Sequence, residues 1–193
     1  MLAQRCQRAF YALLITAIPH SRKRYRTATK WPISHQSPAA NVLVRITDKA
    51  FDPLAELRSC QDALGVKIRQ IGAMASFIGS MRDFNEGDQV TSMTLEHYPG
   101  MTDKHLETIA LAAVQRWQLD EVLIVHRVGE IFPADPIVLV ATWSAHRAHA
   151  FESCRHLMED LKSSAPFWKR EQTATGQRWI ANNTPGTSEE FSR

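Results

Sequence analysis

The spacing of hydrophobic and polar residues predicts a chain of short strands and three longer helices. Apolar or alternating runs predict strands at 42–46, 71–78, 89–98, 122–131, 137–143 and 167–172, and a short strand around Trp179. Apolar residues spaced three and four apart predict helices at 53–64, 102–117 and 146–163. Several predicted strands follow one another without an intervening helix. This order favours an α+β fold with a mixed or antiparallel sheet over a doubly wound fold.

Turn and linker residues mark the ends of the predicted domain. Pro32 and Pro38 lie in a stretch rich in Ser, Ala and Asn, and the sequence after Asn182 is polar. We therefore expect a basic, disordered extension over residues 1–40, one folded domain over 41–182, and a frayed tail over 183–193.

Charge is distributed unevenly between the N-terminal segment and the rest of the chain. The formal net charge is +3, but residues 1–47 contain eight of the 23 basic residues and no acidic residue. The other 15 basic residues share the remaining chain with all 20 acidic residues. The net basicity comes from the N-terminal segment, so it is poor evidence that the folded domain binds nucleic acid.

Cysteine usage and hydropathy indicate a reducing, non-membrane setting. The three cysteines, Cys6, Cys60 and Cys154, form no CxxC pair and have no histidine at a zinc-ligand spacing. No apolar run approaches the roughly 20 residues needed to span a bilayer. Residues 1–40 share some features of signal and transit peptides, but no clear cleavage site follows the apolar run at 9–18. We expect a cytoplasmic protein that does not insert into a membrane.

Basic side chains gather at element ends between Ser144 and Glu171. His146 and Arg147 start the third predicted helix, Lys162 lies in its last turn, and Lys169 and Arg170 follow the turn at Pro166. Helix N-termini bind anions, and arginine adds a planar fork for phosphate or carboxylate. The pattern predicts a site for an anionic, phosphate-bearing ligand, in which a lysine acts as nucleophile or acid–base catalyst.

Each of these residues also has a purely structural interpretation. Lys162 could complement the helix dipole, Lys169 could face solvent, and His146 could pack against Trp143. Arg82, in the loop after a buried strand, could form a local ion pair with Asp83 or Glu86. The residues alone leave both interpretations open.

Familiar cofactor and hydrolase motifs are missing from the sequence. It contains no GxGxxG, Walker loop, GxSxG or HExxH, and the His146/His149 pair lacks a third ligand at a sensible spacing. We expect no bound metal.

Several motifs in a fixed order resemble the large, catalytic subunit of molybdopterin synthase. They lie between about Val42 and Trp179 and leave residues 1–40 unmatched. The matching segments are TLEHYPGM (94–101), IVHRVGE (124–130), SAHR (144–147), LK (161–162) and APFWKRE (165–171).

The resemblance implies an α/β-hammerhead-type fold and a sulfurtransferase of molybdenum cofactor biosynthesis, with its catalytic domain at 41–182. In that family two large subunits form a dimer, and each binds a small, ubiquitin-like sulfur-carrier subunit to give a heterotetramer. The carrier's C-terminal thiocarboxylate supplies two sulfurs in turn to cyclic pyranopterin monophosphate, which forms the molybdopterin dithiolene. No separate cofactor is implied, because the partner brings the sulfur.

The resemblance also implies roles for individual residues. Lys162 and Lys169 match the two essential lysines: Lys162 would be the acid–base at the thiocarboxylate, and Lys169 would stabilise negative charge or transfer a proton. The positions that match substrate-binding residues are Ser80, Met81, Arg82, His146, Arg147, Arg170 and Glu171, together with the two lysines.

The chain departs from the family pattern at three places. Gly79-Ser80-Met81 stands where relatives often carry Lys and Val, Pro133-Ala134-Asp135-Pro136 replaces a Pro-Gly-Asp turn, and Asn182-Asn183 stands where relatives carry a basic residue. Two other functions stay open: a non-catalytic homologue that binds the sulfur carrier, and an anion- or RNA-binding α+β module.

Overall fold

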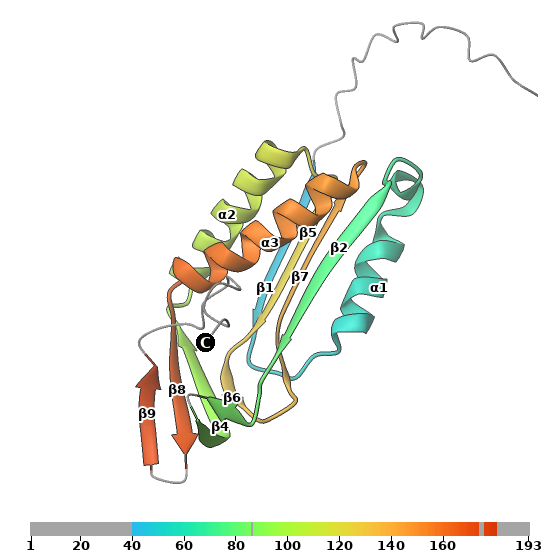
Figure 1. Ribbon diagram of the computed structural model, residues 1–193. Helices are drawn as coiled ribbons and strands as arrows, with labels where there is room; N and C mark the ends of the chain where they lie inside the picture. The colour runs from blue at the N-terminus through green and yellow to red at the C-terminus, as the bar shows by residue number, and fades with distance from the viewer. Residues whose placement is uncertain (1–39, 86, 174–175, 181–193) are drawn as a thin grey trace, which may run out of the picture. The chain divides into compact units, whose positions relative to one another are not determined.

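The computed structural model describes residues 40–180 except 86, 174 and 175. Four strands form a mixed sheet in the order β1–β5–β7–β2 (Figure 1). In this sheet β1 (Asn41–Thr47) is parallel to β5 (Glu121–Arg127), and β5 is antiparallel to β7 (Pro136–Ser144). The edge strand β2 (Ala73–Ser80) is antiparallel to β7.

Helices cover both faces of this first sheet. On one face lies α1 (Pro53–Ala63), which is followed in the chain by the short 3-10 helix η1 (Gly65–Arg69). On the other face lie α2 (Met101–Trp117) and α3 (Arg147–Ser163) (Figure 1). The predicted start of α1 is confirmed: the Asp52 carboxylate accepts hydrogen bonds from the backbone N–H groups of Leu54 and Ala55.

Coverage on both faces explains the sequence of β5. All seven residues of β5 are buried, and its four central residues, Val122–Val125, form a continuous apolar run rather than an alternating one. Its alternate side chains pack into two hydrophobic clusters, one beneath α2 and α3 and the other beneath α1. The helical spacing predicts an apolar stripe on α3 that runs through Phe151, Cys154, Leu157, Met158 and Leu161. The last four are buried in the first of these clusters, whereas Phe151 is 67% exposed.

A second sheet lies against one end of the first (Figure 1). Its strand order is β3 (Phe84–Asn85), β4 (Asp88–His97), β8 (Phe167–Thr173) and β9 (Gly176–Ile180). A short strand, β6 (Gly129–Ile131), also pairs with β4. The paired strands of this sheet are antiparallel.

The predicted α+β class, with its mixed and antiparallel sheets and three α-helices, is confirmed. The strand predicted at 122–131 is in fact two strands, β5 in the first sheet and β6 in the second. Gly129 adopts φ 80° between them and redirects the chain from one sheet to the other. The predicted loop at 79–88 contains the two-residue strand β3.

Two predicted segments, the extension at 1–40 and the tail at 183–193, lie outside the described residues apart from residue 40, so the predicted domain bounds stay predictions. Among the described residues, no helix is both long enough and apolar enough to cross a bilayer.

The turn before β7 holds an alanine in a conformation that favours glycine. Ala134 has φ 72°, its N–H donates to the Met81 carbonyl at 2.9 Å, and the Met81 N–H donates to the Asp135 carbonyl at 2.9 Å. The turn therefore anchors the chain as it leaves β2. A left-handed φ is strained for alanine, which explains why glycine suits this turn.

We predict that Ala134→Gly stabilises the protein by about 0.5–1 kcal/mol, because glycine removes the strain at φ 72°. The matched control is Ala112→Gly, on the exposed face of α2, which should destabilise by about 0.5–1 kcal/mol. Urea unfolding of both variants measures the two effects. A loss of stability in Ala134→Gly would show that the turn is not strained.

Candidate functional site

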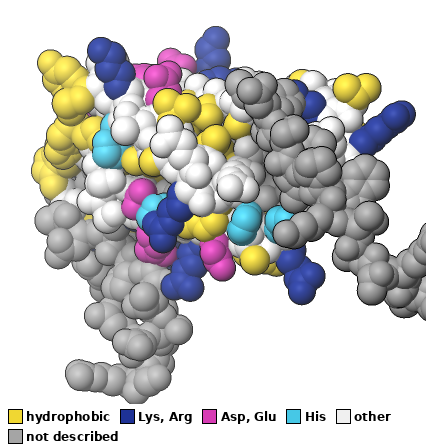
Figure 2. All heavy atoms as spheres, turned by 90° about the horizontal axis from the view of Figure 1, so that it is seen from above, with side chains coloured by type: hydrophobic (Ala, Val, Ile, Leu, Met, Phe, Trp, Pro, Cys, Tyr) yellow, Lys and Arg dark blue, Asp and Glu magenta, His cyan; other side chains and the backbone are white. Residues whose placement is uncertain are grey.

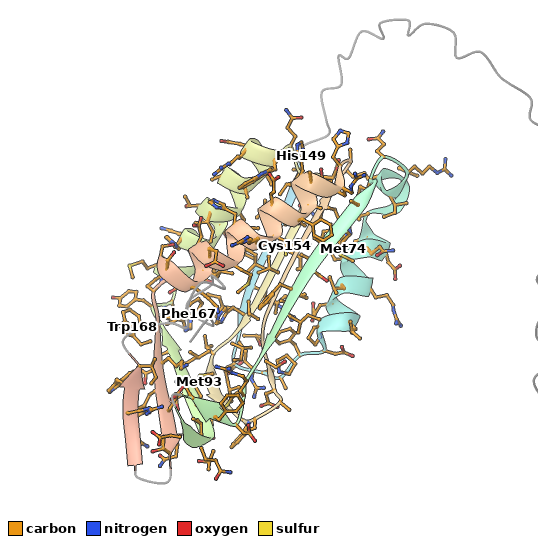
Figure 3. All side chains as sticks on the ribbon, viewed as in Figure 1. Met74, Met93, His149, Cys154, Phe167 and Trp168 are labelled. Carbon is orange, nitrogen blue, oxygen red and sulfur yellow. The ribbon has the colours of Figure 1, made fainter. Side chains whose placement is uncertain are left out.

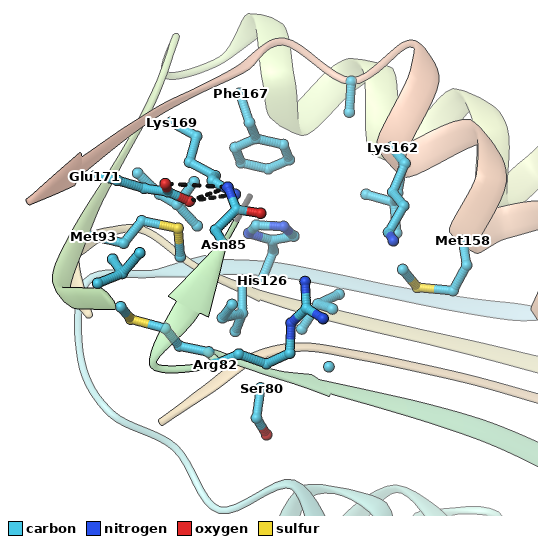
Figure 4. A pocket seen from close by; sticks show the side chains of 18 of the residues that line it. Ser80, Arg82, Asn85, Met93, His126, Met158, Lys162, Phe167, Lys169 and Glu171 are labelled. Atoms are coloured by element: carbon cyan, nitrogen blue, oxygen red, sulfur yellow. Dashed lines mark hydrogen bonds and ion pairs between the residues drawn. The ribbon is translucent and has the colours of Figure 1, made fainter. Parts of the chain in front are cut away.

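A cavity of about 330 Å³ lies between the end of α3, strand β8 and the segment that follows β2. Its apolar wall includes Met93, Leu95, Ile137 and Met158. Its charged lining groups are Arg82, Lys162, Lys169 and Glu171 (Figure 4). With three cations and one carboxylate, the cavity suits an anionic ligand that also has an apolar or aromatic part.

The two lysines reach the cavity from successive elements. Lys162 lies in the last turn of α3, and the chain then turns through Pro166 into β8. In a strand, alternate side chains share a face, so Phe167, Lys169 and Glu171 all point toward the cavity (Figure 4). The structure thus brings together the two lysines that the sequence placed at one edge.

Glu171 is the centre of a polar network beside Lys169. Its carboxylate is 3% exposed and lies 2.9 Å from Lys169 Nζ. Asn85 Nδ2 donates to both carboxylate oxygens, at 2.9 and 3.1 Å, and Arg178 donates at 3.2 and 3.3 Å. Burial by itself would raise the pKa of Glu171, but hydrogen bonds from Lys169, Asn85 and Arg178 lower it below its usual value. The carboxylate stays ionised and holds Lys169 in place.

His126 lies in the middle of the cavity lining, between the Lys169 side and Lys162 (Figure 4). Its ring stacks on Phe167 with centroids 4.0 Å apart and an interplanar angle of 13°. Its Nδ1 is 2.8 Å from the backbone carbonyl oxygen of Arg127. Burial lowers the pKa of His126 to about 4, so the ring is neutral at physiological pH.

Three predicted residues, Ser80 at the end of β2 and Met81 and Arg82 directly after it, all line the cavity. Met81 is buried, and the Arg82 guanidinium lies 4.8 Å from the centre of the Phe84 ring. The hydroxyl of Ser80 points away from the two lysines (Figure 4). The positive charge at this end of the cavity comes from Arg82.

Arg170 lies on the opposite face of β8 from the cavity. Its guanidinium lies 5.4 Å from the centre of the Trp179 ring and donates to Gln177 at 3.3 Å. It belongs to a second, smaller hollow together with Glu130 and Gln172. The alternation that points Lys169 and Glu171 inward necessarily points Arg170 outward.

His146 and Arg147 lie at the far end of α3 from the cavity. Arg147 begins the helix and Lys162 lies in its last turn, so they are separated by about 22 Å along the axis at 1.5 Å per residue. In Figure 3, His149 lies near one end of α3 and Phe167 lies beyond the other. The His146 ring meets the His149 ring edge to face at 5.5 Å. Within one chain, the structure does not bring this pair to the lysines.

One described face of the protein shows no basic stripe of the kind that binds a nucleic-acid backbone (Figure 2). On the face shown in Figure 2, basic and acidic side chains are interspersed among the described residues. A phosphate backbone favours a continuous basic stripe. Over the same part of the chain, no group of three or more His, Cys, Asp or Glu side chains is arranged to hold a metal ion.

Comparison with known proteins gives a family. The model of the MoaE protein family matches residues 46–164. The chain belongs to the MoaE protein family. A protein of Ralstonia nicotianae named molybdopterin synthase catalytic subunit is 53% identical over 137 residues, covering 71% of this chain and 76% of the relative. A Pseudomonas aeruginosa protein of the same name is 50% identical and covers 71% and 89%.

Solved structures confirm the fold of this MoaE-family chain. The molybdopterin biosynthesis MoaE protein from Burkholderia ambifaria has a TM-score of 0.62 at 46% identity, covering 75% of this chain and 93% of that one. The molybdopterin synthase structure from Staphylococcus aureus has a TM-score of 0.62 at 26% identity, covering 71% and 96%. These neighbours bear out the α/β-hammerhead-type fold that the sequence motifs implied.

Three residues of the site in this MoaE-family member were not predicted from the sequence: Asn85, His126 and Arg178. His126 stood inside the IVHRVGE motif but had no assigned role, because nothing in a buried strand shows which side chain meets a cavity. Asn85 and Arg178 join the site only through the pairing of β3 with β4 and of β8 with β9, which no local pattern reveals.

We predict that His126 makes the stability of the fold depend on pH. Its pKa is lowered from 6.5 to about 4 on folding. Below pH 6.5 the His126 ring is protonated in the unfolded chain, whereas in the folded chain it stays neutral down to about pH 4. The free energy of unfolding should therefore fall with decreasing pH in this window, by up to about 3 kcal/mol in total.

His126→Asn removes this titration and should flatten the fall in unfolding free energy between pH 6.5 and 4. The control His149→Asn, at a partly exposed histidine, should keep the wild-type slope. Urea unfolding at a series of pH values measures both. Equal slopes of unfolding free energy against pH for the wild type and His126→Asn would contradict the lowered pKa of His126.

Proposed function

We propose that this protein is the catalytic subunit of molybdopterin synthase, a sulfurtransferase that converts cyclic pyranopterin monophosphate to the molybdopterin dithiolene. The observation that carries the proposal is that Lys162 and Lys169 line one cavity together with Arg82. Family membership and the names of the relatives support it.

The partner in this proposal is a small, ubiquitin-like sulfur-carrier subunit with a C-terminal thiocarboxylate. A related structure from Helicobacter pylori is described as a complex of subunits 1 and 2 of molybdopterin-converting factor. The carrier brings the sulfur to the cavity, so the chain needs no cofactor and no catalytic cysteine. The raised pKa values of Cys60 and Cys154, both about 11 because of burial, suit unreactive core thiols.

The two lysines have different surroundings, which supports separate roles. Lys169 is held against the Glu171 carboxylate at 2.9 Å, so it is a fixed cation that stabilises negative charge developing on the substrate. Lys162 is exposed, whereas Lys169 is half-buried, and Lys162 faces the cavity from the other side (Figure 4). There it meets the carrier's C-terminus and acts as the acid–base group at the thiocarboxylate and the substrate carbon.

We predict that Lys162→Ala and Lys169→Ala each lower the rate of dithiolene formation by at least about 100-fold, as expected for loss of an acid–base or charge-stabilising group. The assay is a single turnover with the thiocarboxylated carrier and the pterin substrate. Lys104→Ala, at an exposed lysine of α2, is the matched control and should leave the rate unchanged. Lys162→Ala at the wild-type rate would overturn the assignment, and a wild-type chain that binds the carrier without turnover would favour the non-catalytic homologue.

In this proposal, His146 and Arg147 contribute to the cavity of a second copy of the chain. They match substrate-binding positions of the family, yet they lie about 22 Å along α3 from Lys162 in the same chain. A dimer of large subunits reconciles the two facts if each subunit contributes its helix N-terminus to the other's cavity. The Arg147 guanidinium would then bind the substrate phosphate as a planar fork.

Mixed dimers test this arrangement. Dimers of Lys162→Ala alone, or of Arg147→Ala alone, should be nearly inactive because every cavity lacks one group. Subunit exchange between the two variants should restore activity, since a mixed dimer contains one cavity with both groups. No recovery after exchange, with heterodimers shown by mass spectrometry, would place Arg147 and Lys162 in separate functions.

A further inference from the structure

His126 presents one ring nitrogen to the cavity without a partner from the described part of the chain. Its Nδ1 is engaged with the Arg127 carbonyl oxygen at 2.8 Å, and no described residue forms a hydrogen bond with Nε2. The residue is 8% exposed and lines the cavity, so Nε2 is directed into the space that a ligand would fill. Nε2 is not among the fully buried side-chain atoms that lack a hydrogen-bond partner, so it is accessible from the cavity and can bond to a ligand there.

The chemistry of Nε2 follows from the bond at Nδ1. A carbonyl oxygen only accepts hydrogen bonds, so Nδ1 carries the ring proton and Nε2 carries a lone pair. Because burial lowers the pKa of His126, the ring is neutral and Nε2 is an acceptor. The stack on Phe167 fixes the plane of the ring and hence the direction of this lone pair.

An acceptor at this position divides the cavity into two chemically different parts. A cyclic phosphate diester carries no P–OH group at neutral pH and offers only acceptor oxygens, so it cannot bond to Nε2. Arg82, Lys162 and Lys169 are the groups that suit the phosphate. What Nε2 can bind is an N–H or O–H group, and a pterin ring has several N–H groups along its edge.

We propose that His126 Nε2 accepts a hydrogen bond from an N–H group of the pterin ring and thereby sets the orientation of the substrate in the cavity. The ring lies with its N–H edge toward β5 and the phosphate lies toward the cationic groups. This inference rests on the proposed function, because it takes the pterin as the ligand.

Two variants separate this role from a structural one. The side-chain N–H of His126→Asn takes the place of Nδ1–H and keeps the bond to the Arg127 carbonyl, but no atom remains at Nε2. The carbonyl oxygen of His126→Gln reaches the position of Nε2 and keeps an acceptor there, but the bond to Arg127 is lost. A structural role predicts that Gln is the more harmful change, and an acceptor role predicts that Asn is.

Calorimetric titration with cyclic pyranopterin monophosphate and, separately, with inorganic phosphate measures the effect. We expect His126→Asn to weaken pterin binding about tenfold, as for loss of one buried hydrogen bond, and to leave phosphate binding unchanged. His126→Gln should bind the pterin within about threefold of wild type. Unfolding curves for both variants check that each is folded.

The nitrogen resonances of His126 in the wild-type protein give an independent test that needs no variant. Adding the pterin should move the Nε2 signal and leave the Nδ1 signal in place, whereas inorganic phosphate should move neither. Two results would overturn the role of His126 and leave the proposed function standing. One is that the wild-type protein binds the pterin but its Nε2 signal does not move, and the other is that His126→Asn binds the pterin with wild-type affinity. Failure of the wild-type protein to bind the pterin would instead overturn the proposed function, and this inference with it.

Discussion

The candidate site depends on the ion pairs and hydrogen bonds that neutralise the buried carboxylate of Glu171. A charge that is 3% exposed must be compensated, and here Lys169, Asn85 and Arg178 compensate it. Asn85 comes from β3, Lys169 and Glu171 from β8, and Arg178 from β9, so one carboxylate joins three strands of the second sheet. The same bonds that neutralise the carboxylate restrict Lys169 to one side of the cavity. The same set of bonds therefore stabilises this part of the sheet and positions the Lys169 amine at the cavity.

A second contact ties this sheet to the first. The His126 ring on β5 stacks on the Phe167 ring at the start of β8, and both rings line the cavity. The stack gives the cavity a flat, neutral region, while Arg82, Lys162 and Lys169 make another part cationic (Figure 4). A ligand with a planar ring and an anionic group matches both regions at once. On the proposed function, this separation would let a site rich in lysine discriminate between a phosphorylated heterocycle and phosphate alone.

The described chain contains only part of the machinery that the proposed function requires. In the proposed function the sulfur comes from another protein, and His146 and Arg147 lie at the far end of α3 from the cavity of their own chain. On this proposal the complete site forms only in an assembly. In such a design the single chain supplies a rigid, charged cavity, and the partners supply the reactive sulfur and further contacts to the substrate.

The sequence by itself determined the three α-helices, most of the strands, the two lysines and the family, because periodicity, capping residues and short motifs are local properties. Asp52 at the start of α1 and the buried stripe through Cys154 illustrate this. Only the tertiary structure decided which charged groups meet. Alternation along β8 sends Lys169 and Glu171 into the cavity and Arg170 to the other face, and the length of α3 separates Arg147 from Lys162. Asn85, His126 and Arg178 entered the site through strand pairing between distant segments. The physical reason is that a local pattern specifies a residue's conformation, whereas its partners depend on register and packing between segments that lie far apart in the chain.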